Sequence, residues 1–323
     1  MSYNYAGQPP YQQAYNPNLN NPYQQAPSGP GWNVNNPNQQ HGYAPPPPMP
    51  PRMNEAYVES GNGPKDNLNF SDQTIRAAFI RKVFTMVAIM LGVVAIMTAV
   101  PFMHPPMKAF IRQNLALYYV SYAVFMVVYI ALMCCESVRR SFPGNLIMTG
   151  LLTLSIGYMT MMITSMYDVT FVLLALIITT VCCGSIIIFA STTKKDLTSM
   201  MGIMFIFSMV LMIFGLVAVM SIFIFKVRWM YTVYSGLAAL LFMFYLAIDI
   251  QMIMGGRKYE ISPEDHIFAA IQVFLDIIYI FWMLLSLLGG SSKYVIVLKT
   301  VVIGINMSVE VARIVRSHFN PGV

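Results

Sequence analysis

The stretch that decides the fold reads WMYTVYSGLAALLFMFYLAIDIQMIMGG (229–256), RKYEISPEDH (257–266) and IFAAIQVFLDIIYIFWMLLSLLG (267–289). The first and third segments are apolar, and each has at least the roughly 20 residues that an α-helix needs to cross a bilayer. The segment between them is short and charged. We therefore expect two adjacent membrane-spanning helices joined by a loop.

Each of these two apolar runs carries one carboxylate, Asp249 in the first and Asp276 in the second. An aspartate in hydrocarbon costs about 3 kcal/mol or more, so we expect both to face a bundle interior, a partner or water. One interpretation is that each carboxylate only hydrogen-bonds a neighbouring helix. Their occurrence on two adjacent helices favours a functional pair, because ionisable residues inside membranes commonly mark ion or proton pathways.

Other polar residues share the face of the second carboxylate. Gln272 lies four residues before Asp276 and Tyr279 lies three after it, which places all three on one side of a helix. If Asp249 and Asp276 meet in a low dielectric, they share a proton and titrate as a pair near neutral pH. The site hypothesis is therefore a proton-sensing cation pair, Asp249 and Asp276, supported by Gln272 and Tyr279.

The rest of the chain is also apolar, with 57% hydrophobic and 10% charged residues. Seven runs have the length of a membrane span: about 83–103, 115–135, 146–166, 171–190, 202–225, 229–254 and 267–288. The net charge of +6 is spread over loop edges, so it carries topology information and forms no nucleic-acid patch. We expect an all-α membrane protein with seven transmembrane helices, residues 70–289, embedded in the lipid bilayer.

The N-terminal segment 1–69 has a different composition. Residues 1–51 contain no Asp, Glu, Lys or Arg and are rich in Pro, Gln, Asn, Tyr and Gly, which predicts a disordered tail. Within it, Pro47, Pro50 and Arg52 match the PxxPxR pattern that SH3 grooves accept, and a WW domain is a related partner for such a proline run. The alternative is a simple solubilising spacer.

A C-terminal extension, residues 290–323, follows the last apolar run. Its apolar part, 294–305, is too short to span a bilayer and contains Lys299. We expect an interfacial or re-entrant segment followed by a weakly amphipathic helix.

Basic residues near the span ends predict the orientation. One set of alternate loops carries Arg76, Arg81, Lys82, Arg139, Arg140, Lys194, Lys195, Arg257 and Lys258. The opposite loops before the seventh run carry only Lys108, Arg112, Lys226 and Arg228. Because cytoplasmic loops are enriched in Lys and Arg, we expect the tail to be cytoplasmic.

Two motifs carry a resemblance to a known family. The stretch FYLAIDIQMIMGGRKYEISPEDHIFAAIQVFLDIIYIF (244–281) resembles the signature of the transmembrane Bax inhibitor motif family, in its lifeguard branch with the glutamate-receptor-associated proteins. The segment FSDQTIRAAFIRKVF (70–84) is similar to the entry into that family's first helix. The resemblance covers roughly residues 68–289 and implies the seven-helix Bax inhibitor fold.

The resemblance also implies a function. It points to a pH-sensitive calcium leak or exchange path in an endomembrane such as the Golgi or endoplasmic reticulum, which restrains apoptosis and stress signalling. It further implies that an arginine at the inner end of the second helix, Arg139 or Arg140, latches onto the aspartate pair. The simpler alternative is that both arginines only hold their loop in the cytosol, and Glu136 is a competing partner.

Two rival function classes remain open. A non-conducting scaffold would regulate membrane receptors or apoptosis regulators through its tail and would not need Asp249 or Asp276. An enzyme is disfavoured, because no histidine pairs with a Ser, Cys or second His at catalytic or metal spacing. We expect no cofactor, and Ca²⁺ only as an ion in transit at the aspartate pair.

Overall fold

The computed structural model describes residues 65–226 and 229–290, and each regular element in these ranges is a helix. Seven helices in them are long and apolar enough to cross a membrane: α1 (Lys65–Met103), α3 (Leu115–Cys134), α5 (Gly144–Ser165), α6 (Val169–Thr192), α7 (Met201–Ile224), α8 (Trp229–Met254) and α9 (His266–Gly289). The predicted all-α fold with seven membrane-spanning helices is confirmed.

Short helices in the connections were not expected from the sequence: α2 (Pro105–Gln113), α4 (Glu136–Arg140), and the 3₁₀ turns η1 (Thr198–Met200) and η2 (Pro263–Asp265). α2 begins where two prolines preset the helical backbone angle and the His104 ring nitrogen accepts a hydrogen bond from the Met107 N–H at 3.3 Å. These elements are too short and too polar to give the apolar pattern of a span.

The first helix is longer than the first apolar run. α1 begins at Lys65, inside the segment assigned to the tail, and continues through the basic residues expected just before the membrane. The proline motif of Pro47, Pro50 and Arg52 and the extension beyond Gly290 lie outside the described residues.

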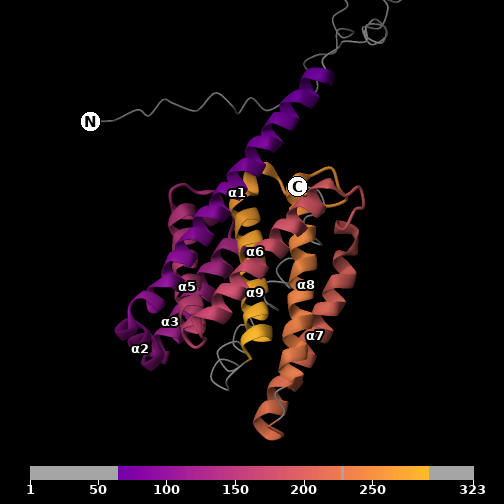
Figure 1. The fold of residues 1–323 in the computed structure, drawn as a ribbon. Helices are drawn as coiled ribbons and strands as arrows, with labels where there is room; N and C mark the ends of the chain where they lie inside the picture. Colours follow the sequence, from indigo (N-terminus) through magenta and orange to yellow (C-terminus); the bar gives the residue numbers. More distant parts are fainter. Residues whose placement is uncertain (1–64, 227–228, 291–323) are drawn as a thin grey trace, which may run out of the picture. The chain divides into compact units, whose positions relative to one another are not determined.

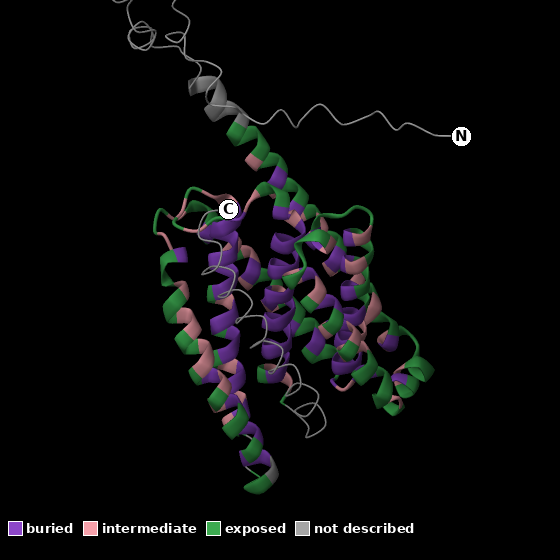
Figure 2. Cartoon of the chain, turned by 180° about the vertical axis from the view of Figure 1, so that it is seen from behind, coloured by how far each residue is buried: buried purple, intermediate pink, exposed green. Residues whose placement is uncertain are grey.

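α9 is the central helix of the described bundle (Figure 1). It packs against α8, α6, α1 and α5, whereas α3 packs on α5 and α7 packs on α8. Residues 267–286 are all buried except the half-buried Ile277, as the colouring of Figure 2 shows. The other helices therefore shield α9 from the surroundings.

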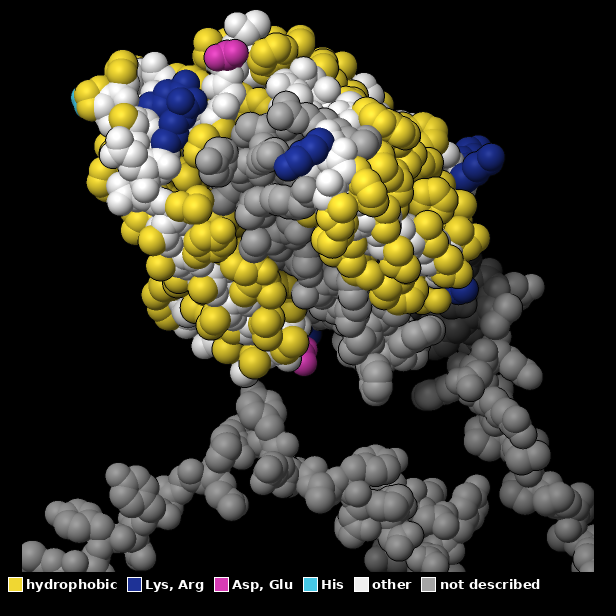
Figure 3. All heavy atoms as spheres, turned by 90° about the horizontal axis from the view of Figure 1, so that it is seen from below, with side chains coloured by type: hydrophobic (Ala, Val, Ile, Leu, Met, Phe, Trp, Pro, Cys, Tyr) yellow, Lys and Arg dark blue, Asp and Glu magenta, His cyan; other side chains and the backbone are white. Residues whose placement is uncertain are grey.

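The outer helices present apolar side chains to the surroundings. In the apolar 18-residue stretch of α7 only 22% of the residues are buried, whereas 94% are buried in that of α9. Hydrophobic side chains also cover most of the described surface in the end-on view of Figure 3, with scattered Lys and Arg. Such a surface suits lipid, because hydrocarbon offers apolar side chains the same environment as a protein interior.

One polar contact ties α9 to α5 inside this apolar bundle. The indole N–H of Trp282 donates to the Thr160 hydroxyl at 3.2 Å, and that hydroxyl donates to the Ile156 carbonyl of its own helix at 2.8 Å. Both side chains are at most 1% exposed. In a dry interior the indole N–H depends on such an acceptor.

We predict that Thr160→Val destabilises the bundle by about 1–2 kcal/mol, because it keeps the side-chain shape but removes the acceptor of the indole N–H. Thermal unfolding in detergent measures the effect. The control is Thr164→Val, since the buried Thr164 hydroxyl donates to the Thr160 and Met161 carbonyls of its own helix. Equal losses in the two variants would contradict an interhelical role for the Trp282 bond.

Candidate functional site

Asp249 and Asp276 both lie in the buried core of the bundle. They are 1% and 2% exposed, and their helices α8 and α9 share the most extensive helix–helix packing of the described chain. At 1.5 Å per residue, Asp249 lies about 7 Å from the end of α8 and Asp276 about 15 Å from the start of α9. The carboxylates thus sit below the α8–α9 loop and away from the lipid-facing surface.

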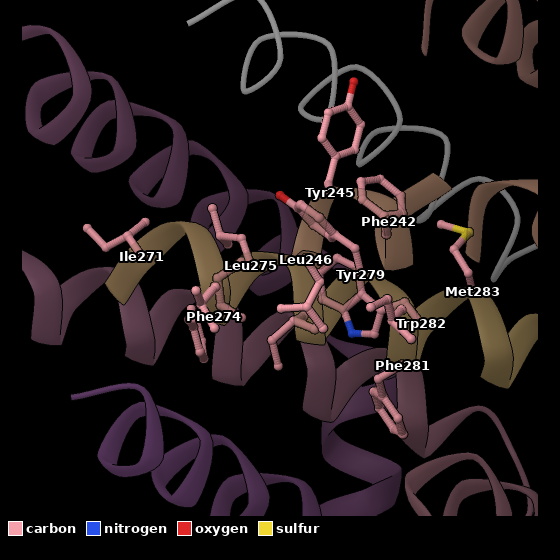
Figure 4. Close-up of a cluster of buried hydrophobic side chains, with 14 of the residues drawn as sticks. Phe242, Tyr245, Leu246, Ile271, Phe274, Leu275, Tyr279, Phe281, Trp282 and Met283 are labelled. Atoms are coloured by element: carbon pink, nitrogen blue, oxygen red, sulfur yellow. The ribbon is translucent and has the colours of Figure 1, made fainter. Parts of the chain in front are cut away.

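Phe242, Tyr279 and Trp282 lie close together in the buried core and form what we call the aromatic layer (Figure 4). The Phe242 and Tyr279 rings are 5.1 Å apart between centroids, and the Tyr279 and Trp282 rings are 5.7 Å apart. Phe242 lies two turns before Asp249, and Tyr279 lies one turn after Asp276. The three rings therefore pack in the interior farther from the α8–α9 loop than the two carboxylates.

A polar end layer closes the other side. We define it by the side chains that hold the loops together at this end: Arg76, Arg139, Arg140, Gln251, Arg257 and Asp265. Within it, Arg139 Nε donates to Asp265 Oδ1 at 3.0 Å, and both side chains are almost fully buried. Arg139 Nη1 also donates to the Leu132 carbonyl at 3.3 Å, so the pair fastens the end of α3 to the start of α9.

Arg140 makes more exposed ion pairs with the same loop. Its guanidinium lies 2.8 Å from Glu136, 3.0 Å from Glu264 and 3.5 Å from Asp265. The hypothesised latch therefore has a different geometry in this structure: the ion-pair partners of Arg139 and Arg140 among the described residues are Asp265, Glu136 and Glu264, and the aspartate pair is not among them.

Arg76 of α1 holds the α8–α9 loop from another side. Its guanidinium donates to the Met252 carbonyl at 2.7 Å and the Ile261 carbonyl at 2.8 Å. Gly255 allows this approach, because its φ is +76° and a Cβ there would lie 2.6 Å from Arg76 Nη2. The loop backbone therefore satisfies its carbonyl groups with a side chain from the first helix.

Gln251 binds the α6–α7 loop to α8. Its Oε1 accepts from the Leu197 N–H at 2.8 Å and its Nε2 donates to the Lys195 carbonyl at 2.8 Å, although the side chain is only 1% exposed. Arg257 adds bonds to the Thr193 and Lys194 carbonyls. Both loops of the end layer are thus anchored to α8.

Asp196 joins the same two loops. Its carboxylate accepts from the Thr198 hydroxyl at 2.6 Å, from the Thr198 N–H at 2.9 Å and from the Lys258 N–H at 3.1 Å. The hydrogen bond from the Thr198 hydroxyl is the main reason that the pKa of Asp196 lies below its ordinary value of 3.8, since such bonds favour the ionised form.

The predicted site residues thus fall into two groups. Asp249, Asp276, Gln272 and Tyr279 all lie in the buried core around α8 and α9, whereas Arg139 and Arg140 lie in the end layer. No group of three or more His, Cys, Asp or Glu that could hold a metal ion occurs among the described residues. A cation at the two aspartates would therefore need further oxygen ligands.

The structural roles of Asp265, Arg76 and Gln251 in the end layer were not predicted from the sequence. For Asp265 there was a signal, because an acidic residue shortly after Pro263 and just before an apolar run is typical of a helix start. For Arg76 and Gln251 the bonded partners are backbone groups 54–185 residues away along the chain. No local pattern encodes such contacts.

Comparison with known proteins adds independent information. The family model described as "Inhibitor of apoptosis-promoting Bax1" matches residues 76–293. The chain is similar to protein lifeguard 3 of Homo sapiens, with 40% identity over 238 residues (74% of this chain and 76% of the relative), and of Mus musculus, with 38% over 246 residues (75% and 80%). It is also similar to protein lifeguard 4 of Mus musculus, with 27% identity over 220 residues (68% and 87%). No solved structure matches the chain.

We predict that Asp265→Asn lowers the free energy of unfolding by about 3–5 kcal/mol, because it leaves the buried charge of Arg139 uncompensated. The control is Glu264→Gln, which removes the neighbouring, exposed partner of Arg140 and should cost about 0–1 kcal/mol. Thermal unfolding of the two purified variants measures both values. A small, equal effect would show that the Arg139–Asp265 pair does not hold α9 in place.

The lowered pKa of Asp196 predicts a pH effect on stability. A group with a depressed pKa stabilises the fold fully above its unfolded pKa, and this contribution disappears as the pH falls through its folded pKa. Below about pH 4 the wild type should therefore lose this contribution to its stability. Asp196→Asn lacks the carboxylate, so it should show no corresponding loss. Unfolding midpoints of both proteins between about pH 6 and pH 3 test this. Parallel curves would contradict the role of the Asp196 carboxylate.

Proposed function

Because the chain belongs to the Bax inhibitor family, we propose that it forms a pH-sensitive path for Ca²⁺ across an endomembrane and restrains apoptosis. The matched residues 76–293 include the motif at 244–281 and most of the motif at 70–84, so the resemblance to the family is confirmed. The observation that carries the transport proposal is the burial of Asp249 and Asp276 in the two most buried spans.

Two carboxylates in one buried core give a physical reason to propose proton or cation binding. Removing a carboxylate from water costs several kcal/mol, which a proton or a cation offsets. Carboxylate oxygens are the ligands that Ca²⁺ prefers, and two such groups without a complete cage allow weak, reversible binding. The same groups bind protons, so acid and Ca²⁺ compete for one site. This competition supports a pH-dependent path.

The structure corresponds to a closed path in this proposal. We assign the two barriers to the aromatic layer, with its contacting rings, and to the end layer, with its buried Arg139–Asp265 ion pair. Ion passage requires both to part. The many bonds that converge on the α8–α9 loop would make opening at the end layer a cooperative event.

The proposal includes a cytoplasmic position for the end layer and the N-terminus. The end layer gathers the basic side chains of α1, α4 and the loops after α6 and α8 at one end of the bundle. The opposite end has fewer, among them Lys108, Arg112 and Lys226. This asymmetry supports the orientation through the preference of basic residues for the cytoplasmic side.

The partners belong to the proposal as well. We propose that the protein acts without a cofactor or catalytic group and limits apoptosis by setting the Ca²⁺ content of a compartment such as the Golgi or endoplasmic reticulum. The tail would then serve location or partner binding, through Pro47, Pro50 and Arg52 on an SH3 or WW domain. Apoptosis regulators or membrane receptors would be recruited in the same way.

We predict that purified protein in liposomes conducts Ca²⁺ with a flux transition near neutral pH, and that Asp249→Asn or Asp276→Asn removes this transition from the neutral range. Each substitution deletes one charge of the pair, so the remaining carboxylate titrates alone and the midpoint moves by more than about one pH unit. Ca²⁺ flux measured against pH, at equal reconstituted amounts, tests this.

Asp168→Asn is the matched control, since it makes the same chemical change at an exposed position. Its flux curve should coincide with that of the wild type. Curves that are identical for wild type and both core variants would remove the aspartate pair from the mechanism. The non-conducting scaffold would then become the better description.

A further inference from the structure

Polar side chains follow one face of α9 from the end layer to the bundle centre. Asp265, Gln272, Asp276 and Tyr279 are spaced by seven, four and three residues, which places them within one narrow stripe of a helix. They are 5%, 1%, 2% and 1% exposed. We call these four residues the polar file. From Asp265 to Asp276 the file extends about 16 Å along the helix.

Gln272 is the member of the file whose burial has no structural explanation. Neither Nε2 nor Oε1 of its amide has a hydrogen-bond partner among the residues that the structure describes. Burying an amide without partners costs about 1–3 kcal/mol in proteins. A leucine would fill about the same volume without this penalty. Packing alone therefore does not explain why an amide stands at position 272.

Gln251 provides an internal comparison. It is the same residue type with the same exposure of 1%, and both its amide atoms are occupied by the loop that it anchors. Gln251 thus shows how this protein uses a buried glutamine as a structural clamp. Gln272 lacks such bonds and lies instead in the polar file, one turn from Asp276.

We propose that Gln272 is a cation-binding position between Asp276 and the end layer, where its amide oxygen coordinates a partly hydrated divalent cation. The inference rests on the proposed transport function and names a residue that performs it. An amide oxygen is a hard ligand that Ca²⁺ accepts together with carboxylates and water. Being neutral, it holds a cation more weakly than a third carboxylate would.

This weakness suits the place of Gln272 in the file. Along α9 itself, about 16 Å separate Asp276 from Asp265 at the end layer, and Asp265 is already paired with Arg139. An intermediate ligand divides this distance into steps, while its low affinity lets the ion leave again. The amide Nε2 can donate to the water molecules that accompany the ion.

The first test measures access to Gln272 without relying on transport. Gln272→Cys is made in a background in which Cys134, Cys135, Cys182 and Cys183 are replaced by serine or alanine, and the reconstituted protein is treated with a small cationic methanethiosulfonate. Ile271→Cys is the control, because Ile271 is equally buried and points about 100° away around α9. We expect the thiol at 272 to react about tenfold faster or more, with Ca²⁺ slowing the reaction. Equal rates at 271 and 272, or no protection by Ca²⁺, would overturn the proposal.

The second test uses flux and keeps the proposal falsifiable if the cysteine variant does not fold. Gln272→Leu should reduce Ca²⁺ flux about tenfold while the pH midpoint set by the aspartates stays in place. Gln272→Glu keeps an oxygen ligand at the same position, so it should retain Ca²⁺ binding and slow its release. Unchanged flux in Gln272→Leu would overturn the proposal. If the wild type carries no Ca²⁺ at all, the proposed function fails, and the labelling result still decides whether Gln272 is a hydrated, Ca²⁺-sensitive position.

Discussion

The structure depends on keeping polar groups away from lipid, where no water can satisfy them. α9 carries a carboxylate, a glutamine and a tyrosine on one face, and none of these could face hydrocarbon without a cost of about 1–3 kcal/mol or more. The arrangement of the other helices follows from this constraint. α1, α5, α6 and α8 surround α9, while α3 and α7 pack behind them. The spans of α1, α3, α6 and α7 are the least buried and carry most of the apolar outer surface.

The same constraint explains the end layer. Helix ends leave carbonyl groups without intrahelical partners, and near a membrane they need other donors. Here long side chains supply them: Arg76 bonds the end of α8, Arg139 the end of α3, and Gln251 the loop after α6. Each bond also fixes one loop relative to α8 or α9. The same side chains therefore complete the hydrogen bonds of the loop backbone and position the two helices that carry Asp249 and Asp276.

The sequence predicted what depends on local composition. Seven spans, and the burial of Asp249 and Asp276, follow from apolar length and from the cost of a charge in lipid. The helices α2 and α4 were not predicted, because a helix of one or two turns does not give the long apolar pattern of a membrane span. α2 also starts with prolines. The ion pair of Arg139 with Asp265 was not predicted for another reason. The two residues lie 126 positions apart in the chain, and several acidic residues were equally compatible as partners of Arg139.

The position of Arg139 changes how a latch could control the aspartates. Its partner Asp265 directly precedes α9, whereas Asp276 lies about three turns further along the chain, inside this helix. A change in the Arg139–Asp265 ion pair can therefore affect Asp276 only if α9 moves as a rigid element or if the change is transmitted along the polar file. A two-state movement of α9 would couple them, since freeing Asp265 releases the helix at the end where Arg76, Arg139 and Arg140 hold the adjoining loop. In the proposed path, the bonds of the end layer would then set the stability of the closed state, and the charge on the aspartates would bias it.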